Sequence, residues 1–208
     1  MKTKTLIFTI ISSVILISTY IFRNKIWGEP ESQIVKTQNT VNNNNNNFKH
    51  LIGSKWVNQK NNLKSAELGF TIDGDIKKTK GFFEKFDIVF KVSESNPKEA
   101  KMKVSIDVSS INTANKIRDK ALMDSDFFNL EKYPKITYQS KTINFKNNQT
   151  ISEGSLNFIG VESKLKFKFE HKGVHQNNEG INVAIFEGEF AFDRTKYGMD
   201  HVASVGDL

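Results

Sequence analysis

The sequence predicts an all-β protein, an antiparallel barrel of about eight strands with one short helix. Apolar and polar residues alternate with a period of two through most of the chain after Trp56. That alternation is typical of antiparallel strands with one buried face and one solvated face. Turn signals such as Asn96-Pro97 and Gly160 separate the alternating runs. Many short strands at regular spacing indicate a sandwich or a barrel.

Each expected strand follows from one alternating run. In the seventh run, for example, Leu165, Phe167 and Phe169 alternate with Lys166 and Lys168. Lysines spaced in this way are more simply the wet face of a strand than a binding patch. The expected strands cover residues 55–58, 65–73, 82–92, 100–110, 135–145, 150–158, 163–171 and 181–193.

One helix is expected between the fourth and fifth strands. Ala114, Ile117 and Ala121 are spaced three and four residues apart, which places them on one apolar stripe of a helix. Asn112 or Thr113 is a suitable N-cap. We expect this helix and the Phe-rich turn after it to lie over one end of the barrel.

The N-terminal segment has the composition of a membrane span. Residues 5–22 are eighteen uncharged residues with basic residues on both sides. This length is closer to the ~20 residues of a spanning helix than to the apolar run of about 7 to 15 residues in a cleaved signal peptide. We therefore expect residues 1–25 to be an uncleaved signal anchor, with cleavage and secretion as the alternative. Residues 26–50, which include six consecutive asparagines, are expected to form a disordered linker, and residues 51–208 the folded domain.

Charge and motif content argue against several functions. The net charge is +7, but the first fifty residues hold six basic and two acidic residues, so the rest is near balance and nucleic-acid binding is not expected. The chain has no cysteine, which excludes disulfides, thiolate metal sites and a lipid-modified cysteine anchor. The common hydrolase, nucleotide-binding and zinc-protease motifs are absent. The sequence therefore predicts no catalytic residue, no cofactor and no metal.

Two pairs of side chains have the spacing of possible sites. His171 and His175 are four residues apart but flank an expected hairpin, so a metal site is the less favoured interpretation. Glu187 and Glu189 share a strand face, as the two acids of a glycosidase could, yet a solvated face explains them better.

Residues 105–140 carry several short motifs in a fixed order. They are Ile106-Asp107, Ser110-Ile111-Asn112-Thr113, Arg118-Asp119, Asp126-Phe127-Phe128, Tyr133-Pro134 and Tyr138-Gln139-Ser140. Together they resemble the signature of the YceI-like family of polyisoprenoid-binding proteins. Residues 81–86, 154–160 and 193–198 resemble further motifs of that family, so the resemblance covers about three quarters of the chain.

This resemblance implies a lipocalin-like barrel that holds a long apolar lipid tail, without catalysis. It also implies that the barrel lies on the outer side of the membrane, periplasmic or extracellular. The family usually continues into one more strand beyond the position of Leu208. We therefore expect the strand at 181–193 to have an open edge beside residues 186–192, and association or homodimer formation there.

The chain contains seventeen phenylalanines, which either fill a solid core or line a cavity. The residues alone leave both possibilities open, because an eight-stranded barrel is either just filled or holds one small ligand. The resemblance favours a cavity. The predicted tunnel lining is Phe70, Ile72, Phe86, Phe90, Val104, Ile106, Phe127, Phe128, Tyr138, Phe158, Phe167, Phe169, Phe186 and Phe190. Arg118, Asp119 and Arg194 are predicted to contact a head group or to be structural.

The sequence thus predicts a membrane-anchored protein that binds or carries a polyisoprenoid, an isoprenoid quinone or a similar amphiphile. The alternative is a ligand-free structural or interaction module displayed from the membrane. A hydrolase at the barrel mouth is a third and weaker hypothesis, which would require a titratable pair in a cleft.

Overall fold

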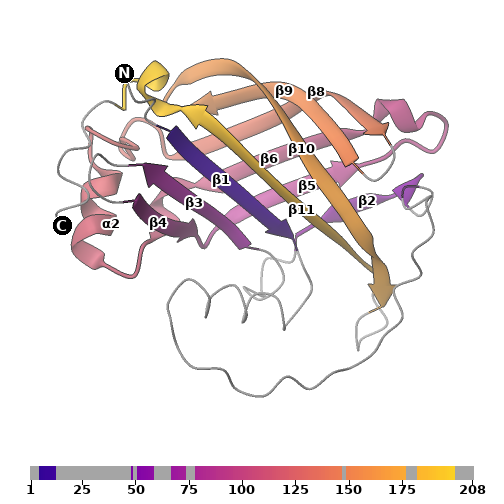
Figure 1. The fold of residues 1–208 in the computed structure, drawn as a ribbon, viewed down its shortest axis with the longest axis horizontal. Coiled ribbons are helices and arrows are strands. Elements are labelled where there is room, and N and C mark those ends of the chain that lie inside the picture. The colour runs from indigo at the N-terminus through magenta and orange to yellow at the C-terminus, as the bar shows by residue number, and fades with distance from the viewer. Residues whose placement is uncertain are drawn as a thin grey trace.

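The period-two runs form one continuous antiparallel sheet in the computed structural model of the chain (Figure 1). The structure describes residues 5–12, 48, 51–58, 67–73, 78–146, 149–176 and 182–199. Within these residues the sheet has 11 strands and is strongly curled, and the α-helix α2 lies at one end of it. The all-β class and the single short helix of the prediction are confirmed.

Each of the eight expected ranges contains a strand, and three further strands bring the number among the described residues to 11, so the predicted count of about eight is too low. The strands are β1 Thr5–Ser12, β2 Lys55–Val57, β3 Glu67–Asp73, β4 Lys78–Phe83, β5 Phe86–Lys91, β6 Lys101–Asp107, β7 Ile111–Asn112, β8 Lys135–Lys146, β9 Gln149–Phe158, β10 Val161–Gln176 and β11 Asn182–Asp193. Three short 3-10 helices are η2 Pro97–Glu99, η3 Val108–Ser110 and η4 Arg194–Tyr197, and α2 is Lys116–Met123.

The sheet curls at two breaks, one between β4 and β5 and the other between β6 and β7. The strand order is β2-β5-β6-β8-β9-β10-β11-β1-β3-β4-β7. β4 and β5 follow each other across a break at Glu84-Lys85, and β6 and β7 are separated only by η3. Since β5 pairs with β6 while β4 pairs with β7, the far end of the strand order returns beside β6.

Hydrogen bonds hold this double bend in place. The Lys85 amide donates to the Ser110 hydroxyl at 2.9 Å, and the Asp107 amide donates to the Lys85 carbonyl at 2.9 Å. The Asp107 carboxylate caps η3 by accepting from the amide of Ser109 at 3.0 Å and from its hydroxyl at 2.6 Å. The prediction of unbroken strands at 82–92 and 100–110 is therefore wrong, because these contacts break each of them.

The N-terminal segment departs from its prediction. Thr5–Ser12 is a strand, β1, and not the start of a spanning helix. β1 pairs antiparallel with β11 on one side and with β3 on the other, so its backbone groups have partners in the sheet. Residues 13–47 lie outside the described residues, and they include most of the expected linker at 26–50. In the part of the chain that is described, no helix is long and apolar enough to cross a membrane.

The expected open edge beside residues 186–192 is also wrong. β11 pairs with β10 on one side, and β1 occupies its other side through the register Thr5↔Asp193 to Ser12↔Phe186. The association predicted at this edge depended on unpaired backbone groups, and here they are paired.

The helix begins at Lys116, two residues after the first residue of the predicted apolar stripe. Asn115 is its N-cap, and the Asn115 side chain accepts hydrogen bonds from the amides of Ile117 and Arg118 at 3.0 and 3.2 Å. Ala114 has a φ of 60°, a left-handed conformation that excludes it from the helix. Ile117 is 71% exposed, whereas Leu122 is fully buried, so the predicted stripe and its N-cap at 112 or 113 are both wrong.

The core lies inside the curl and follows the alternation. On β10 the side chains of Leu165, Phe167 and Phe169 are buried, while Lys166 and Lys168 between them are exposed. β6 behaves in the same way, with Met102, Val104 and Ile106 buried. The alternation therefore predicted the correct face of these strands.

Candidate functional site

All fourteen side chains nominated as tunnel lining face the interior of the curled sheet or its α2 end. Phe86, Phe186 and Phe190 are half-buried against the core. The buried members are Phe70, Ile72, Phe90, Val104, Ile106, Phe127, Phe128, Tyr138, Phe158, Phe167 and Phe169.

The α2 end of the interior is closed by aromatic rings. Phe128, from the turn after α2, lies edge-on to Phe83 and to Phe158, with ring centroids 5.7 and 5.8 Å apart. Phe158 in turn contacts Tyr197 of η4 at 5.2 Å. Edge-to-face packing of this kind adds about 0.5–1.5 kcal/mol per pair beyond simple burial. This end is therefore a packed plug.

The opposite end carries a second aromatic cluster, with one histidine in it. The ring centroid of Phe48 lies 4.6 Å from that of Phe145 on β8 and 6.2 Å from that of His171 on β10. His171 is 4% exposed and lies 5.1 Å from Phe186, so its surroundings are mainly apolar. Among the described residues, no group of three His, Asp or Glu side chains is arranged to hold a metal ion.

Between the two clusters lies a small internal void of about 20 Å³. A cavity needs roughly 10–15 Å³ by this measure to hold one water molecule. The void is therefore about the size of one or two waters and does not hold a lipid chain as it stands. Its lining residues are Leu68, Val104, Ile106, Ile136, Thr137, Tyr138, Leu156, Phe167 and Phe190.

Five of these nine lining residues were nominated from the sequence, and four were missed. The missed ones are Leu68, Ile136, Thr137 and Leu156. Leu68, Ile136 and Leu156 are buried and stand in the same alternating rows as the nominated residues. The period-two pattern that marks the nominated residues also marks these three positions, although none of them is a phenylalanine.

A few hydroxyl groups enter the apolar interior from β8 and β9. The Tyr138 hydroxyl is 2.6 Å from the Ser152 hydroxyl, and the Met102 amide donates to the Ser140 hydroxyl at 2.7 Å. Burial raises the pKa of Tyr138, so this phenol is neutral at physiological pH. The Thr150 hydroxyl is fully buried and has no hydrogen-bond partner in the described structure. Polar groups are thus present near the interior, but those of Tyr138 and Ser140 are already engaged.

Arg118 and Asp119 organise the turn between β7 and α2. The Arg118 guanidinium donates to the hydroxyl and the carbonyl of Thr113 at 3.0 and 2.8 Å. The Asp119 carboxylate accepts from the Thr113 amide at 2.7 Å and from its hydroxyl at 2.6 Å. Thr113 is fully buried, so both charged residues serve the fold at this point.

Arg194 is also placed by local structure. Its side chain is fully buried, and its guanidinium donates to the Met199 carbonyl across η4. The contacts of Arg118, Asp119 and Arg194 therefore correspond to the predicted structural role.

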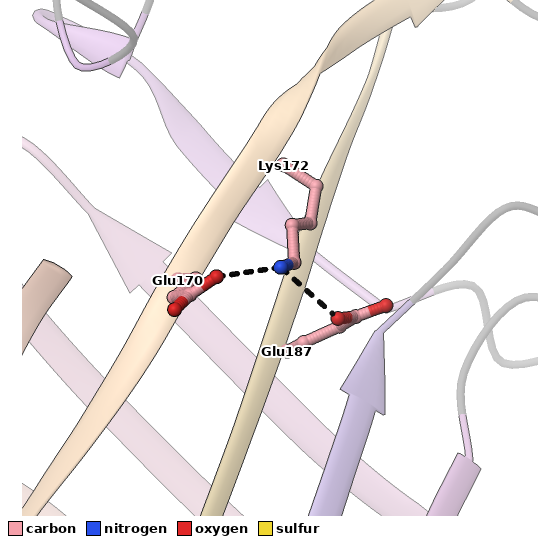
Figure 2. A network of polar contacts seen from close by, with 3 residues as sticks. All are labelled: Glu170, Lys172 and Glu187. Carbon is pink, nitrogen blue, oxygen red and sulfur yellow. Dashed lines mark hydrogen bonds and ion pairs between the residues drawn. The ribbon is translucent and has the colours of Figure 1, made fainter. Parts of the chain in front are cut away.

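Glu187 lies on the outer face of the sheet in a small ion network. Lys172 of β10 contacts the Glu170 carboxylate at 2.5 Å and the Glu187 carboxylate at 3.5 Å, as Figure 2 shows. The hydrogen bond that the Lys172 ammonium donates to the Glu170 carboxylate raises the pKa of Lys172. All three side chains are more than 40% exposed, so the network contributes little to stability. It explains Glu187 as part of a solvated strand face.

Comparisons with known proteins agree with this architecture. Residues 35–208 match the YceI-like domain. The UPF0312 protein SAB2563 of Staphylococcus aureus is 31% identical over 126 residues, which cover 60% of this chain and 71% of the relative. The crystal structure of the Campylobacter jejuni YceI protein superposes with a TM-score of 0.53 at 27% identity, covering 59% of this chain and 72% of that one. The chain therefore belongs to the YceI-like family.

Proposed function

We propose that the interior of the curled sheet binds a long-chain apolar lipid, such as a polyisoprenoid or an isoprenoid quinone. The observation that carries this proposal is the central void, because almost every side chain around it is aliphatic or aromatic. Each CH₂ group buried there would contribute about 0.8 kcal/mol, so a long tail needs no polar contact inside. The family resemblance in residues 105–140 supports the same ligand class.

The present void accommodates no such chain, so binding requires the interior to widen. The side chains best able to move are the half-buried Phe186 and Phe190 of β11. They lie on β11, the strand that pairs with β1. We propose that widening occurs between the central void and this strand.

The direct test is to extract the purified protein and identify bound molecules by native mass spectrometry. A co-purified apolar molecule, or a rise in Tm on adding polyprenol or quinone, is the expected result. Val104→Ile adds one methyl group beside the void and should lower the lipid content. Val161→Ile adds the same group at a position that is 40% exposed and serves as the matched control. An empty protein that no such lipid stabilises would contradict lipid binding.

The alternative function is a ligand-free structural or interaction module. The small size of the void is the observation that favours it, since a filled interior needs no ligand for stability. The same extraction experiment separates the two functions. Under either of them we propose that the protein acts without catalysis, and a screen for hydrolysis of ester and glycoside substrates tests that point.

We also propose that the N-terminal segment attaches the protein to a membrane, with the sheet domain on the outer side. The support is the uncharged run of residues 5–22 and its basic flanks. The mass of the mature protein in membrane and soluble fractions tests this. An intact chain in the membrane fraction is the expected result, and a shortened soluble chain would favour secretion after cleavage.

A further inference from the structure

Strand β1 occupies a central place in the sheet although it belongs to the segment with the composition of a membrane span. Its residues pair with β11 from Thr5↔Asp193 to Ser12↔Phe186. On its other side they pair with β3 from Leu6↔Ile72 to Ile11↔Glu67. β1 therefore fills the seam between two strands that do not pair with each other in the sheet order.

The sequence of β1 differs from that of the other strands. Leu6, Phe8 and Ile10 stand in register with the buried Ile72, Phe70 and Leu68. Ile7 and Ile11 are also apolar, although they stand in the other row, opposite the exposed Ala191 and the half-buried Glu187. A strand that only closes a sheet with one solvated face needs apolar residues in one row. A segment that also enters a bilayer needs them in both.

Pairing in the sheet and insertion into a bilayer compete for residues 5–12. If residues 5–12 stay in the sheet, only residues 13–22 remain of the uncharged run. Ten helical residues span about 15 Å, half of the ~30 Å hydrocarbon core of a bilayer. A spanning state must therefore include residues 5–12 and withdraw β1 from the sheet.

We propose that residues 5–12 exchange between the β3–β11 seam and the lipid bilayer, so that insertion of the segment opens the sheet. Opening removes the strand that lies in register with Phe186 and Phe190 of β11 and with Leu68 and Phe70 of β3. These residues border the interior, so the seam opens toward the void beside a membrane surface. This inference depends on the proposed membrane attachment and not on the proposed ligand.

Hydrogen exchange on the full chain tests the proposal, with and without vesicles of phosphatidylcholine and phosphatidylglycerol. In the vesicle-bound chain we expect loss of protection at the amides of residues 68–72 and 186–192 that face β1. The amides of β8 and β9, which pair with each other away from the seam, should keep their protection and serve as the internal control. Cosedimentation with the vesicles measures attachment separately.

The register supplies a matched pair of variants. In the register Ile11 is paired with Glu187 of β11 and with Glu67 of β3, so Ile11→Lys puts opposite charges at paired positions and is compatible with the sheet. The same lysine near the middle of the uncharged run should lower insertion into vesicles by about 100-fold. Ile11→Lys should therefore stay protected at the seam when vesicles are added. Ile10 is paired with Leu68 of β3 and with Gly188 of β11, so Ile10→Lys should destabilise both the strand in the sheet and the segment inserted in the bilayer.

Three outcomes are distinguishable. Loss of seam protection in the vesicle-bound wild-type chain, abolished in Ile11→Lys, supports the exchange. A chain that cosediments with vesicles while its seam amides remain protected overturns the exchange and leaves membrane attachment standing. A chain that does not cosediment overturns both, whereas lipid extraction tests the ligand independently.

Discussion

Phe167 offers the most direct test of the packed interior, because it lies beside the void and within the aromatic network. Its side chain is 6% exposed, and its ring centroid lies 5.2 Å from that of Phe190 and 5.3 Å from that of Tyr138. Replacing a buried phenylalanine by alanine costs about 3–5 kcal/mol through lost transfer free energy and the cavity that remains. The side chains around Phe167 leave the existing void unfilled. We therefore expect that they also do not fill the larger cavity that the substitution creates.

For Phe167→Ala we therefore expect a loss of about 3–5 kcal/mol in the free energy of unfolding. At roughly 2–4 °C per kcal/mol for a chain of this size, Tm should fall by about 6–20 °C. Urea and thermal unfolding followed by circular dichroism measure both quantities. Lys168→Ala, at an exposed position on the same strand, should change stability by no more than about 0.5 kcal/mol.

The enlarged cavity should also accept a small apolar molecule. Benzene binds dry engineered cavities of about 150 Å³, so it should recover part of the lost Tm in Phe167→Ala and leave the wild type unchanged. A loss below about 1 kcal/mol would be typical of a surface position. Such a value would refute the placement of Phe167 in a packed core.

Three further substitutions probe the interior and the bend. Gly154→Ala would place a Cβ 2.7 Å from a backbone Cα of β8, so we expect destabilisation of several kcal/mol in urea unfolding. Tyr138→Phe leaves the buried Ser152 hydroxyl without its partner at 2.6 Å and should cost about 1–3 kcal/mol. Asp107→Asn removes a carboxylate whose pKa the Ser109 hydroxyl lowers. Because the folded pKa is depressed, this contribution is present at neutral pH and is lost as pH falls through the folded pKa.

Each of these predictions has a clear contrary result. A fully stable Gly154→Ala would mean that β8 and β9 lie further apart than the structure places them. An unchanged Tyr138→Phe would show that Ser152 finds another partner. If the difference between Asp107→Asn and wild type were the same at acidic and neutral pH, the charge of the carboxylate would have no role in capping η3.

The sequence predicted those features that depend on neighbouring residues. Period-two alternation identified the buried row of β6 and of β10, because side chains on successive residues of a strand point to opposite faces. It could not reveal the break between β4 and β5, since that bend is made by hydrogen bonds from Lys85 to η3, more than twenty residues away. The left-handed backbone of Ala114, which moves the helix start, likewise carries no sequence signal at an alanine.

The sequence predicts the apolar composition of the interior but not the size of its void. The apolar character of the interior follows from the alternating rows, and Val104, Tyr138 and Phe167 line its void. The volume of the void depends on how rings such as Phe167 and Phe190 interlock, which no single-residue property determines. β1 was missed for a related reason, because its partner β11 lies at the other end of the chain.

That separation has a consequence for biosynthesis. β1 ends at residue 12 and β11 begins at residue 182, so 170 residues must be synthesised before the two strands can meet. At about 5–20 residues per second, the interval is roughly 10 to 30 s. During this time β1 can pair with β3 but not with β11, so the proposed insertion into a membrane would compete only with the contact between β1 and β3. The contact between β1 and β11 therefore has a very high contact order and is among the last contacts of the sheet to form.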